Sequence, residues 1–282
     1  MMRFPENVWC LFMELSNFTS IRLLVLSSDI TAKELYNLMM KKVIDPNNRE
    51  HVDVNGNPRI SGFIKIQKDD SSITSYMIYM KKVGSFQRIK ITAPEEFTMQ
   101  KEELKIPAMA VLRLRLSKLG RWFIEISPSY DSTAVATLRS LLESSAGKFA
   151  RIKFCNEMID FIHNNLKVTN IREKNLLAPD GTTEVLYATA MTADASKTNA
   201  DKYYYDPQYV VNFEVYAKTS RNIDIPVILR RDGRVRIKGL DQLDSEETSD
   251  LVVKVLNEIE EMYEEICINK RRDYQVKNFV LK

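Results

Sequence analysis

The stretch from Ile223 to Lys238 reads IDIPVILRRDGRVRIK and carries the strongest fold signal in the chain. Two apolar-rich runs flank Asp232-Gly233, a dipeptide that is typical of the two-residue type I′ turn of a β-hairpin. After this turn, cations alternate with aliphatic residues from Arg234 to Lys238. Successive side chains of a strand point to opposite faces, so the alternation predicts a strand with one buried apolar face and one exposed cationic face.

Four other stretches alternate a cation with an aliphatic or aromatic residue in the same way. They are Lys65-Ile66, Arg88–Ile91, Arg113–Leu116 and Arg151–Phe154. We expect each to be a strand, and we expect folding to gather the exposed cations on a basic sheet surface. The cations predicted for this surface are Lys65, Arg88, Lys90, Arg113, Arg115, Arg151, Lys153, Arg234, Arg236 and Lys238.

The first half of the chain reads as strands with two amphipathic helices. Thr31 and Glu34 have the spacing of a helix capping box, and Asp131 or Ser132 is the expected N-cap of the second helix. The segment from Pro94 to Pro107 is expected to be a connection between strands. Strands are predicted at 21–26, 63–68, 74–81, 86–91, 110–116 and 122–126, and helices at 32–43 and 132–144.

The second half repeats the mixture and ends in a long helix. Leu251, Val255, Ile259, Met262 and Ile266 fall at helical spacing and predict its buried side. Together the halves predict an α+β fold, in which antiparallel β-meanders are each backed by amphipathic helices. Strands are expected at 150–154, 184–192, 209–218, 223–231 and 234–238, and helices at 157–166 and 245–268.

The chain has 282 residues, close to the size of about 250–300 residues at which a single core stops growing. We therefore predict an N-terminal α+β domain at 1–146 and a C-terminal one at 147–282, with one continuous fold as the alternative. Ile106-Pro107 and Ile225-Pro226 each lead into a strand, a turn, a strand and a helix. An internal duplication is one explanation, and independent use of a common unit is the other.

Composition is that of an ordinary globular protein, with 44% apolar and 28% charged residues. The net charge of +3 is weakly basic. A strongly positive surface can therefore form only if the fold gathers cations on one face and carboxylates elsewhere. Cys10, Cys155 and Cys267 are widely spaced and form no CxxC pair, which favours a reducing, cytoplasmic location. No stretch approaches the length of about 20 uncharged residues that a membrane span requires.

Signatures of enzymes are sparse in this sequence. The chain has two histidines, His51 and His163, too few for a multi-histidine metal site. Its eight glycines form neither a dinucleotide-binding fingerprint nor a P-loop. We therefore expect no catalytic activity, no cofactor and no resident metal.

The basic strand faces favour a non-catalytic protein that holds the phosphate backbone of DNA or RNA. Unpaired bases would stack on Tyr76, Tyr79, Trp122 and the cluster Tyr203–Tyr205. The competing interpretation is that carboxylates on neighbouring strands neutralise the cations in ordinary ion pairs. The acids considered for this role are Glu125, Glu214 and Asp224.

A second hypothesis makes the chain an adaptor subunit that docks on a catalytic partner of a nucleic-acid-processing complex. The segment from Asp244 to Glu265 is strongly acidic, and the tail that follows is basic. Such charge asymmetry often marks an interaction surface. The tail residues predicted to bind a partner are Lys270, Arg271 and Arg272.

Overall fold

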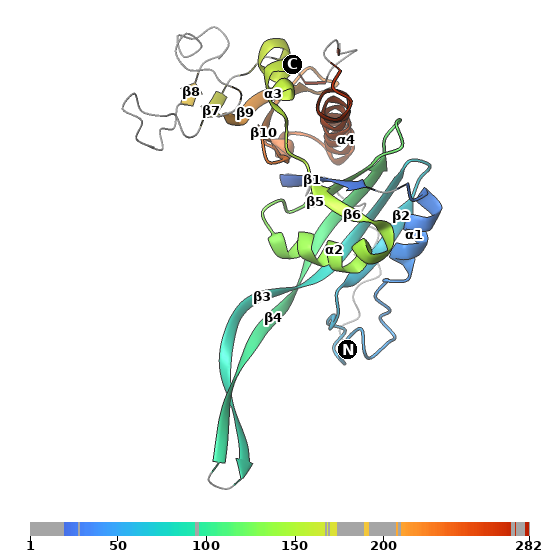
Figure 1. Ribbon diagram of the computed structural model, residues 1–282, viewed down its shortest axis with the longest axis vertical. Helices are drawn as coiled ribbons and strands as arrows, with labels where there is room; N and C mark the ends of the chain where they lie inside the picture. Colours follow the sequence, from blue (N-terminus) through green and yellow to red (C-terminus); the bar gives the residue numbers. More distant parts are fainter. Residues whose placement is uncertain are drawn as a thin grey trace. The chain divides into compact units, whose positions relative to one another are not determined.

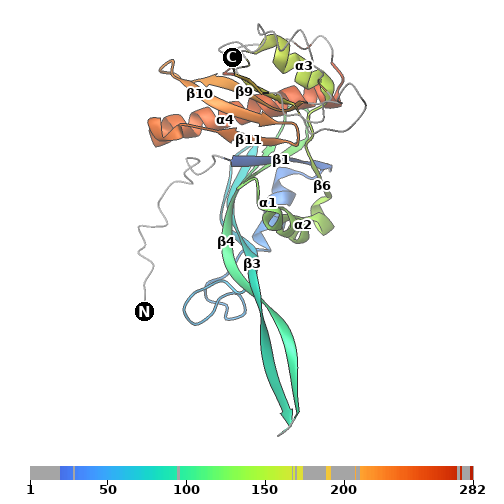
Figure 2. The ribbon, with the colours of Figure 1, turned by 90° about the vertical axis from the view of Figure 1, so that its left-hand side faces the viewer.

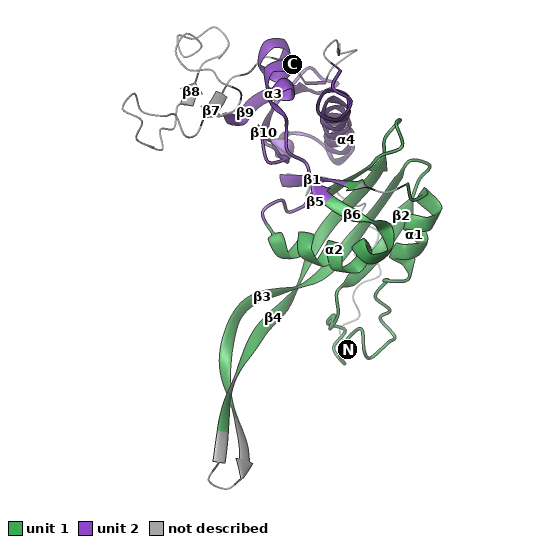
Figure 3. Ribbon diagram, viewed as in Figure 1, with its two compact units in different colours: residues 1, 26–126, 131–149 green, residues 2–25, 127–130, 150–282 purple. Residues whose placement is uncertain are grey.

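The computed structural model describes residues 20–27, 29–93, 96–166, 168, 170–173, 189–191, 207, 210–271, 274 and 280–281. They belong to two compact units (Figure 3). Among the described residues, unit 1 comprises those within Leu26–Ile126 and Asp131–Phe149, and unit 2 comprises those within 20–25, Ser127–Tyr130 and 150–281. The chain thus crosses between units more than once, because a strand near the N-terminus and a short connection after Ile126 belong to the second unit.

Unit 1 is a meander with helices on one face (Figure 1). Its strands β2 (Gly62–Lys68), β3 (Ser72–Ala93), β4 (Glu96–Leu116) and β5 (Trp122–Ser127) lie in chain order in the sheet. Helices α1 (Ala32–Met40) and α2 (Ser132–Ala146) pack on β3. Apolar side chains such as Leu138 of α2 and Met77 of β3 are fully buried in the resulting core. The α+β class predicted from the sequence is confirmed.

The capping predictions for the two helices of unit 1 are confirmed. The amide of Glu34 donates to Thr31 Oγ1 at 3.2 Å, and the Thr31 amide donates to Glu34 Oε2 at 2.9 Å, which is a reciprocal capping box. Asp131 caps α2 and also accepts hydrogen bonds from the Tyr79 hydroxyl and Lys81 Nζ, both at 2.9 Å. Burial opposes ionisation of Asp131, but these hydrogen bonds hold its pKa below the ordinary value.

The prediction of a connecting segment between Pro94 and Pro107 is wrong. The backbone of β4 pairs antiparallel with β3 from Arg115 opposite Ser72 out to Glu96 opposite Ala93, with irregular register after Lys82 and Ile91. Residues 96–107 therefore form the outer part of one strand of a long β-hairpin. Sequence periodicity missed them because charged residues occupy both faces at Lys101-Glu102-Glu103, so no apolar alternation reveals the strand.

The strands of unit 2 also pair in antiparallel fashion. Their order is β1 (Ser20–Ser27), β11 (Arg234–Ile237), β10 (Asp224–Arg230), β9 (Val210–Lys218), β7 (Asn170–Glu173) and β8 (Thr189–Met191). Strand β6 (Lys148–Arg151) lies beside β1, and helix α3 (Asn156–Asn165) follows it. The predicted hairpin at Asp232-Gly233 is confirmed, but its loop has three residues, because Arg230 pairs with Arg234. Gly233 takes the left-handed conformation there, with φ of 75°.

The long C-terminal helix α4 (Ser245–Met262) continues as the π-helix η5 (Tyr263–Ile268) and packs on the sheet of unit 2 (Figure 2). Its predicted apolar side, from Leu251 to Ile266, is buried. Asp244 caps the helix by accepting a hydrogen bond from the Glu247 amide at 2.8 Å. The opposite side of β9 to β11 has no such cover from α4, because strand side chains alternate between the two faces.

A disulfide joins Cys155 to Cys267 within unit 2, with their Cα atoms 5.6 Å apart. The two cysteines are 112 residues apart in the sequence, and folding brings the start of α3 beside η5. A bond of this kind is unusual in a reducing compartment, so it weighs against the cytoplasmic location expected from cysteine spacing. Among the described helices, none has the length and hydropathy needed to cross a membrane.

Candidate nucleic-acid interface

A row of arginines crosses the sheet of unit 2 on the face opposite α4. Arg22 of β1 pairs with Arg234 of β11, which in turn pairs with Arg230 of β10. Paired residues on neighbouring antiparallel strands point to the same face and lie about 5 Å apart. The three side chains are half-buried, while Val235 and Leu229 on the other face are fully buried. We call Arg22, Arg230 and Arg234, with Asp232, the arginine row.

The arginines of this row are held by specific partners. Arg22 Nε donates to the carbonyl oxygen of Ser129 at 2.9 Å, and Arg234 Nε donates to Asp232 Oδ2 at 2.8 Å. Arg230 Nε lies 3.5 Å from Asp232 Oδ1. Burial and then the neighbouring charge of Arg234 lower the pKa of Arg22, whereas the hydrogen bond to Asp232 raises the pKa of Arg234.

Asp232 does not neutralise the whole group. Burial favours its neutral form, but the hydrogen bond and charge of Arg234, followed by the charges of Arg230 and Arg22, hold the pKa of Asp232 below its ordinary value. Arg151, on β6 beside β1, adds a further positive charge that acts on Arg22. Three guanidinium groups thus act on the one carboxylate and a fourth acts on Arg22, so the local charge stays positive.

The hairpin loop that carries Asp232 is fixed by close backbone contacts. A Cβ atom added to Gly233 would lie 2.5 Å from the carbonyl oxygen of Ile152, closer than two such atoms can approach. The Leu23 amide donates to Gly233 O at 2.9 Å, and the Phe154 amide donates to Arg231 O at 2.9 Å. Arg231 also donates to the Pro207 carbonyl and to Asn156 Oδ1. The arginine row is therefore built on a rigid support.

The next register positions on the same face extend the cationic surface. Arg236, between Ser20 and Ile228 in the register, is exposed and has no ion-pair partner among the described residues. Lys238 is exposed, and its Nζ forms an ion pair with Glu214 Oε2 at 2.9 Å. At this position a carboxylate therefore neutralises a predicted cation, as the competing interpretation expects. Tyr216 of β9 is half-exposed two residues further along the same face.

The predicted cations of unit 1 do not form such a surface. Arg113 is buried, and its Nη1 donates to both carboxylate oxygens of Glu125, at 2.9 and 3.1 Å. The guanidinium carbon of Arg115 lies 5.7 Å from the centre of the Phe123 ring, a cation–π contact. Arg88 forms an ion pair with Glu102 at 3.2 Å. Glu125 is thus the neutralising carboxylate that the competing interpretation named.

The remaining predicted cations have separate positions. Lys65 lies at an irregularity of β2 with φ of 51°. The Lys90 side chain lies outside the described part of the structure. Arg151 and Lys153 are exposed in unit 2, while Ile152 and Phe154 between and after them are buried, as the alternation predicted. Lys153 follows β6 and is not in a strand.

Sequence reasoning missed Arg22 and Arg230. Arg22 stands in Ile21-Arg22-Leu23-Leu24, and Arg230 ends an apolar run, so neither belongs to an alternating cationic stretch. Only the pairing of the strands reveals these two arginines, because it places each of them directly opposite Arg234. Pairing between β1 and β11 joins segments more than two hundred residues apart, which local patterns cannot show.

Two of the residues predicted to stack on bases belong to the core. Trp122 is fully buried, and its Nε1 donates to the Ile30 carbonyl at 2.8 Å. Tyr79 is 2% exposed and donates to Asp131. Both predictions are wrong, since neither ring has an open face. Tyr76 is half-exposed, and Tyr203–Tyr205 lie outside the described residues.

The acidic segment from Asp244 to Glu265, predicted to dock on a partner, is partly buried. Glu260 and Glu264 of the acidic helix are buried, and Glu258 accepts hydrogen bonds from the amides of Val280 and Leu281 at 3.2 and 3.1 Å. Burial raises the pKa of Glu258 to about 8. Of the tail residues, Lys270 is exposed, Arg271 forms an ion pair with Glu265 at 3.4 Å, and Arg272 lies outside the described residues.

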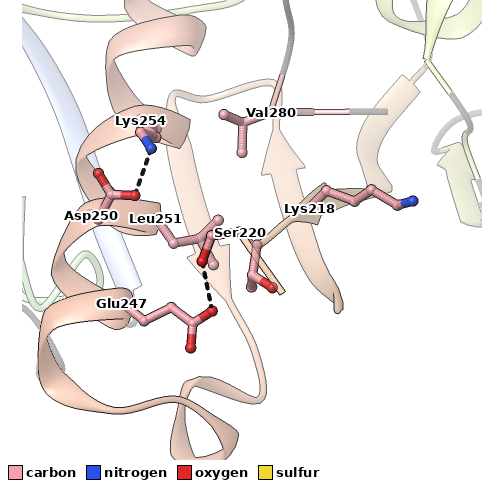
Figure 4. A pocket seen from close by; sticks show the side chains of 8 residues that line it. Lys218, Ser220, Glu247, Asp250, Leu251, Lys254 and Val280 are labelled. Carbon is pink, nitrogen blue, oxygen red and sulfur yellow. Dashed lines mark hydrogen bonds and ion pairs between the residues drawn. The ribbon is translucent and has the colours of Figure 1, made fainter. Parts of the chain in front are cut away.

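A small pocket in unit 2 lies between the end of β9 and helix α4 (Figure 4). Its charged walls are already paired: Lys254 contacts Asp250 at 2.6 Å, and the Ser220 hydroxyl donates to Glu247 at 3.2 Å. Its volume is about 160 Å³, below the range of about 300–1,000 Å³ that is usual for ligand sites. The pocket is therefore a weaker candidate than the arginine row.

The histidines show no catalytic arrangement in the described residues. His51 Nδ1 accepts a hydrogen bond from the Asp45 amide at 3.0 Å in a loop, and His163 lies on α3. Within the ranges that the structure describes, no three His, Cys, Asp or Glu residues are grouped to hold a metal ion.

No model of a known protein family matches this chain, and no curated protein matches it. Its function is therefore argued from its residues and their geometry.

Proposed function

We propose that this protein binds nucleic acid without catalysing a reaction, and that the phosphate backbone lies across the open face of the unit 2 sheet. The observation that carries the proposal is the arginine row, in which Arg22, Arg234 and Arg230 occupy one register line on three neighbouring strands. Strands lie about 4.8 Å apart, so the row spans about 10 Å. A single polyanion contacts several of these guanidinium groups at once.

The chemistry of the row suits phosphate. Guanidinium groups present planar pairs of N–H donors that match the oxygens of a phosphodiester. Arg236 and Lys238 continue the positive surface, and Tyr216 supplies an aromatic side chain two positions beyond Glu214 on the same face. Such contacts position a backbone without reading its sequence, so we propose binding to DNA or RNA with little base preference.

The test measures the affinity for generic single-stranded and double-stranded oligonucleotides at a series of salt concentrations. Fluorescence anisotropy of the labelled oligonucleotide monitors the binding. Each phosphate contact adds about 0.7 to the slope of log affinity against log salt for single strands. The triple variant Arg22→Gln, Arg230→Gln, Arg234→Gln is expected to lower that slope by about 2. Its circular dichroism and melting temperature show whether it still folds.

Two further variants separate binding from a structural role. Arg59→Gln removes an exposed cation from unit 1 and is expected to leave the slope unchanged. Asp232→Asn removes the carboxylate between the arginines and is expected to tighten binding at low salt, which a purely structural ion pair would not do. Absence of binding in low salt, or an affinity that does not respond to salt, would refute the proposal.

A further inference from the structure

Tyr130 is the most exposed aromatic residue in the described part of the chain, at 70%. Phe86 of unit 1 follows at 48%. The residues on either side of Tyr130, Ser129 and Asp131, are both buried. The backbone is therefore enclosed here while the tyrosine ring extends into solvent. A single exposed apolar side chain is ordinary, so the importance of this ring depends on the surface beside it.

Ser129 ties the backbone before Tyr130 to strand β1. Its amide donates to the Ser20 carbonyl at 2.9 Å, and the hydroxyl oxygens of Ser129 and Ser20 lie 2.6 Å apart. Its own carbonyl oxygen accepts the hydrogen bond from Arg22 Nε at 2.9 Å. Ser20 and Arg22 are two residues apart on β1, so their side chains point to the same face, that of the arginine row. Both side chains contact Ser129, which places this connection on that face.

Tyr130 therefore lies at the β1 end of the arginine row. Its Cα atom is three bonds from the Ser129 carbonyl oxygen that Arg22 contacts. Adding the lengths of these bonds to the hydrogen bond of 2.9 Å puts the Cα within about 7 Å of Arg22 Nε. A nucleotide joins its phosphate to its base through a single sugar. A phosphate held by Arg22 thus leaves a neighbouring base within reach of the tyrosine ring.

A row of cations with an aromatic ring at its end matches a strand of nucleic acid, in which charged phosphates alternate with flat bases. Proteins that bind single strands combine a positive surface along the backbone with aromatic side chains on which bases stack. In a duplex the bases are already stacked on one another, so the ring finds no open base. An acidic peptide would satisfy the arginines and leave Tyr130 without a flat partner.

We propose that Tyr130 stacks on an unpaired base beside the phosphates held by the arginine row, so that this surface selects single-stranded nucleic acid. This role rests on the proposed function, because the row has to hold the backbone before a base can reach the ring. The row supplies affinity that depends on salt. Tyr130 supplies the preference for unpaired bases, whatever their sequence.

The test compares three labelled oligonucleotides of equal length by fluorescence anisotropy. They are a thymine single strand, a strand with the same phosphates but abasic sugars, and a duplex. The wild-type protein is expected to bind the thymine strand about tenfold more tightly than the abasic strand. Equal affinities for these two strands would overturn the role of Tyr130 and leave the proposed function standing. Absence of binding to all three would refute the proposed function itself.

Tyr130→Ala removes the ring and no cation. It is expected to lower the affinity for the thymine strand about tenfold. The affinities for the abasic strand and the duplex, and the salt slope, are expected to stay unchanged, because no phosphate contact is lost. Tyr130→Phe keeps the ring and is expected to bind like the wild type. An equal loss with all three oligonucleotides would show that Tyr130 only supports the surface, and would overturn the proposal.

Tyr36→Ala is the matched control, because it removes a half-exposed tyrosine from α1 of unit 1. It is expected to bind all three oligonucleotides like the wild type. A loss of affinity for the thymine strand as large as that of Tyr130→Ala would remove the distinction between the two tyrosines and contradict the proposal. Melting temperatures show that each variant folds.

Arg234→Gln is expected to have the opposite pattern to Tyr130→Ala. It removes a cation of the row, so the affinities for the thymine strand and the abasic strand are expected to fall by the same factor. The ratio between these two affinities stays at about ten, because the ring is still present. A ratio that Arg234→Gln abolishes while Tyr130→Ala preserves it would assign the preference for bases to the arginine row and overturn the role of Tyr130.

Discussion

Arg113-Leu114-Arg115-Leu116 in unit 1 and Arg234-Val235-Arg236-Ile237 in unit 2 have the same alternating pattern but different environments. In both, the aliphatic residues are buried or nearly so. The cations differ: Arg113 is buried against Glu125, whereas Arg234 is half-buried in the arginine row and Arg236 is exposed. Alternation assigns side chains to a face, but what covers that face decides whether a cation binds a ligand or stabilises the core.

The largest expected effect comes from breaking the buried ion pair of unit 1. Arg113→Leu leaves the Glu125 carboxylate, which is fully buried, without its guanidinium partner. The free energy of unfolding is expected to fall by about 3–5 kcal/mol, measured by urea denaturation. The double variant with Glu125→Leu is expected to recover most of that loss. Arg236→Leu, which removes the exposed arginine of the matching stretch in unit 2, is expected to change stability by less than about 0.5 kcal/mol.

Glu258 of unit 2 provides a contrast with Glu125, because its described hydrogen-bond partners are two backbone amides. An unfolded chain releases this proton near pH 4.5, while the folded protein keeps it until about pH 8. Between these values the folded state binds more protons, so the free energy of unfolding falls as pH rises. Glu258→Gln stays neutral, and the wild type is expected to lose on the order of 2 kcal/mol relative to it across this window.

Denaturation of both proteins at a series of pH values measures that difference. Since other groups titrate equally in the two proteins, the difference isolates Glu258. Parallel pH profiles would show that Glu258 is ionised in the folded protein at neutral pH.

The turns that precede β5 and β11 each contain a glycine, and the two glycines have different surroundings. Gly120 and Gly233 both have positive φ, of 82° and 75°. A Cβ atom at Gly120 meets nothing within 4 Å, whereas one at Gly233 meets the Ile152 carbonyl. Gly120→Ala is expected to cost about 1 kcal/mol through backbone strain alone, and Gly233→Ala about 2–3 kcal/mol. Equal losses of thermal stability would argue against a rigid support for the arginine row.

The smallest expected effect concerns binding. Arg236→Gln is expected to weaken oligonucleotide affinity about threefold and to lower the salt slope by just under 1, because one phosphate contact is lost. Arg115→Gln, at the corresponding position of unit 1, is expected to leave both values unchanged, since Arg115 lies over the Phe123 ring. Equal effects of the two variants on affinity would contradict the proposal that cations of unit 2, and not those of unit 1, contact the phosphate backbone.

Local patterns predicted most elements well. The capping spacing of Thr31 and Glu34, the helical stripe from Leu251 to Ile266 and the hairpin at Asp232-Gly233 are all present in the structure. Each depends on residues close together in the chain. The duplication of strand-turn-strand-helix units stays a prediction: both units exist, but β4 has 21 residues and β10 has 7.

Patterns failed where both faces of a strand have similar surroundings. The outer half of β4 is exposed on both sides, so its residues show no apolar period, and their pattern predicts a connection from Pro94 to Pro107. The sequence predicts Trp122 and Tyr79 as exposed stacking residues, because it does not show that their hydrogen-bond partners are the Ile30 carbonyl and Asp131. These errors arise from long-range packing that no local window contains.

The sequence by itself determined most of the strands and helices and which side of each is apolar, because these properties follow from spacing along the chain. The tertiary structure alone decided which cations meet. It placed Arg22 beside Arg234 by pairing strands distant in sequence, and it buried Arg113 against Glu125. The physical reason is that the energy of a charge depends on its surroundings in space, and those surroundings come from the whole fold.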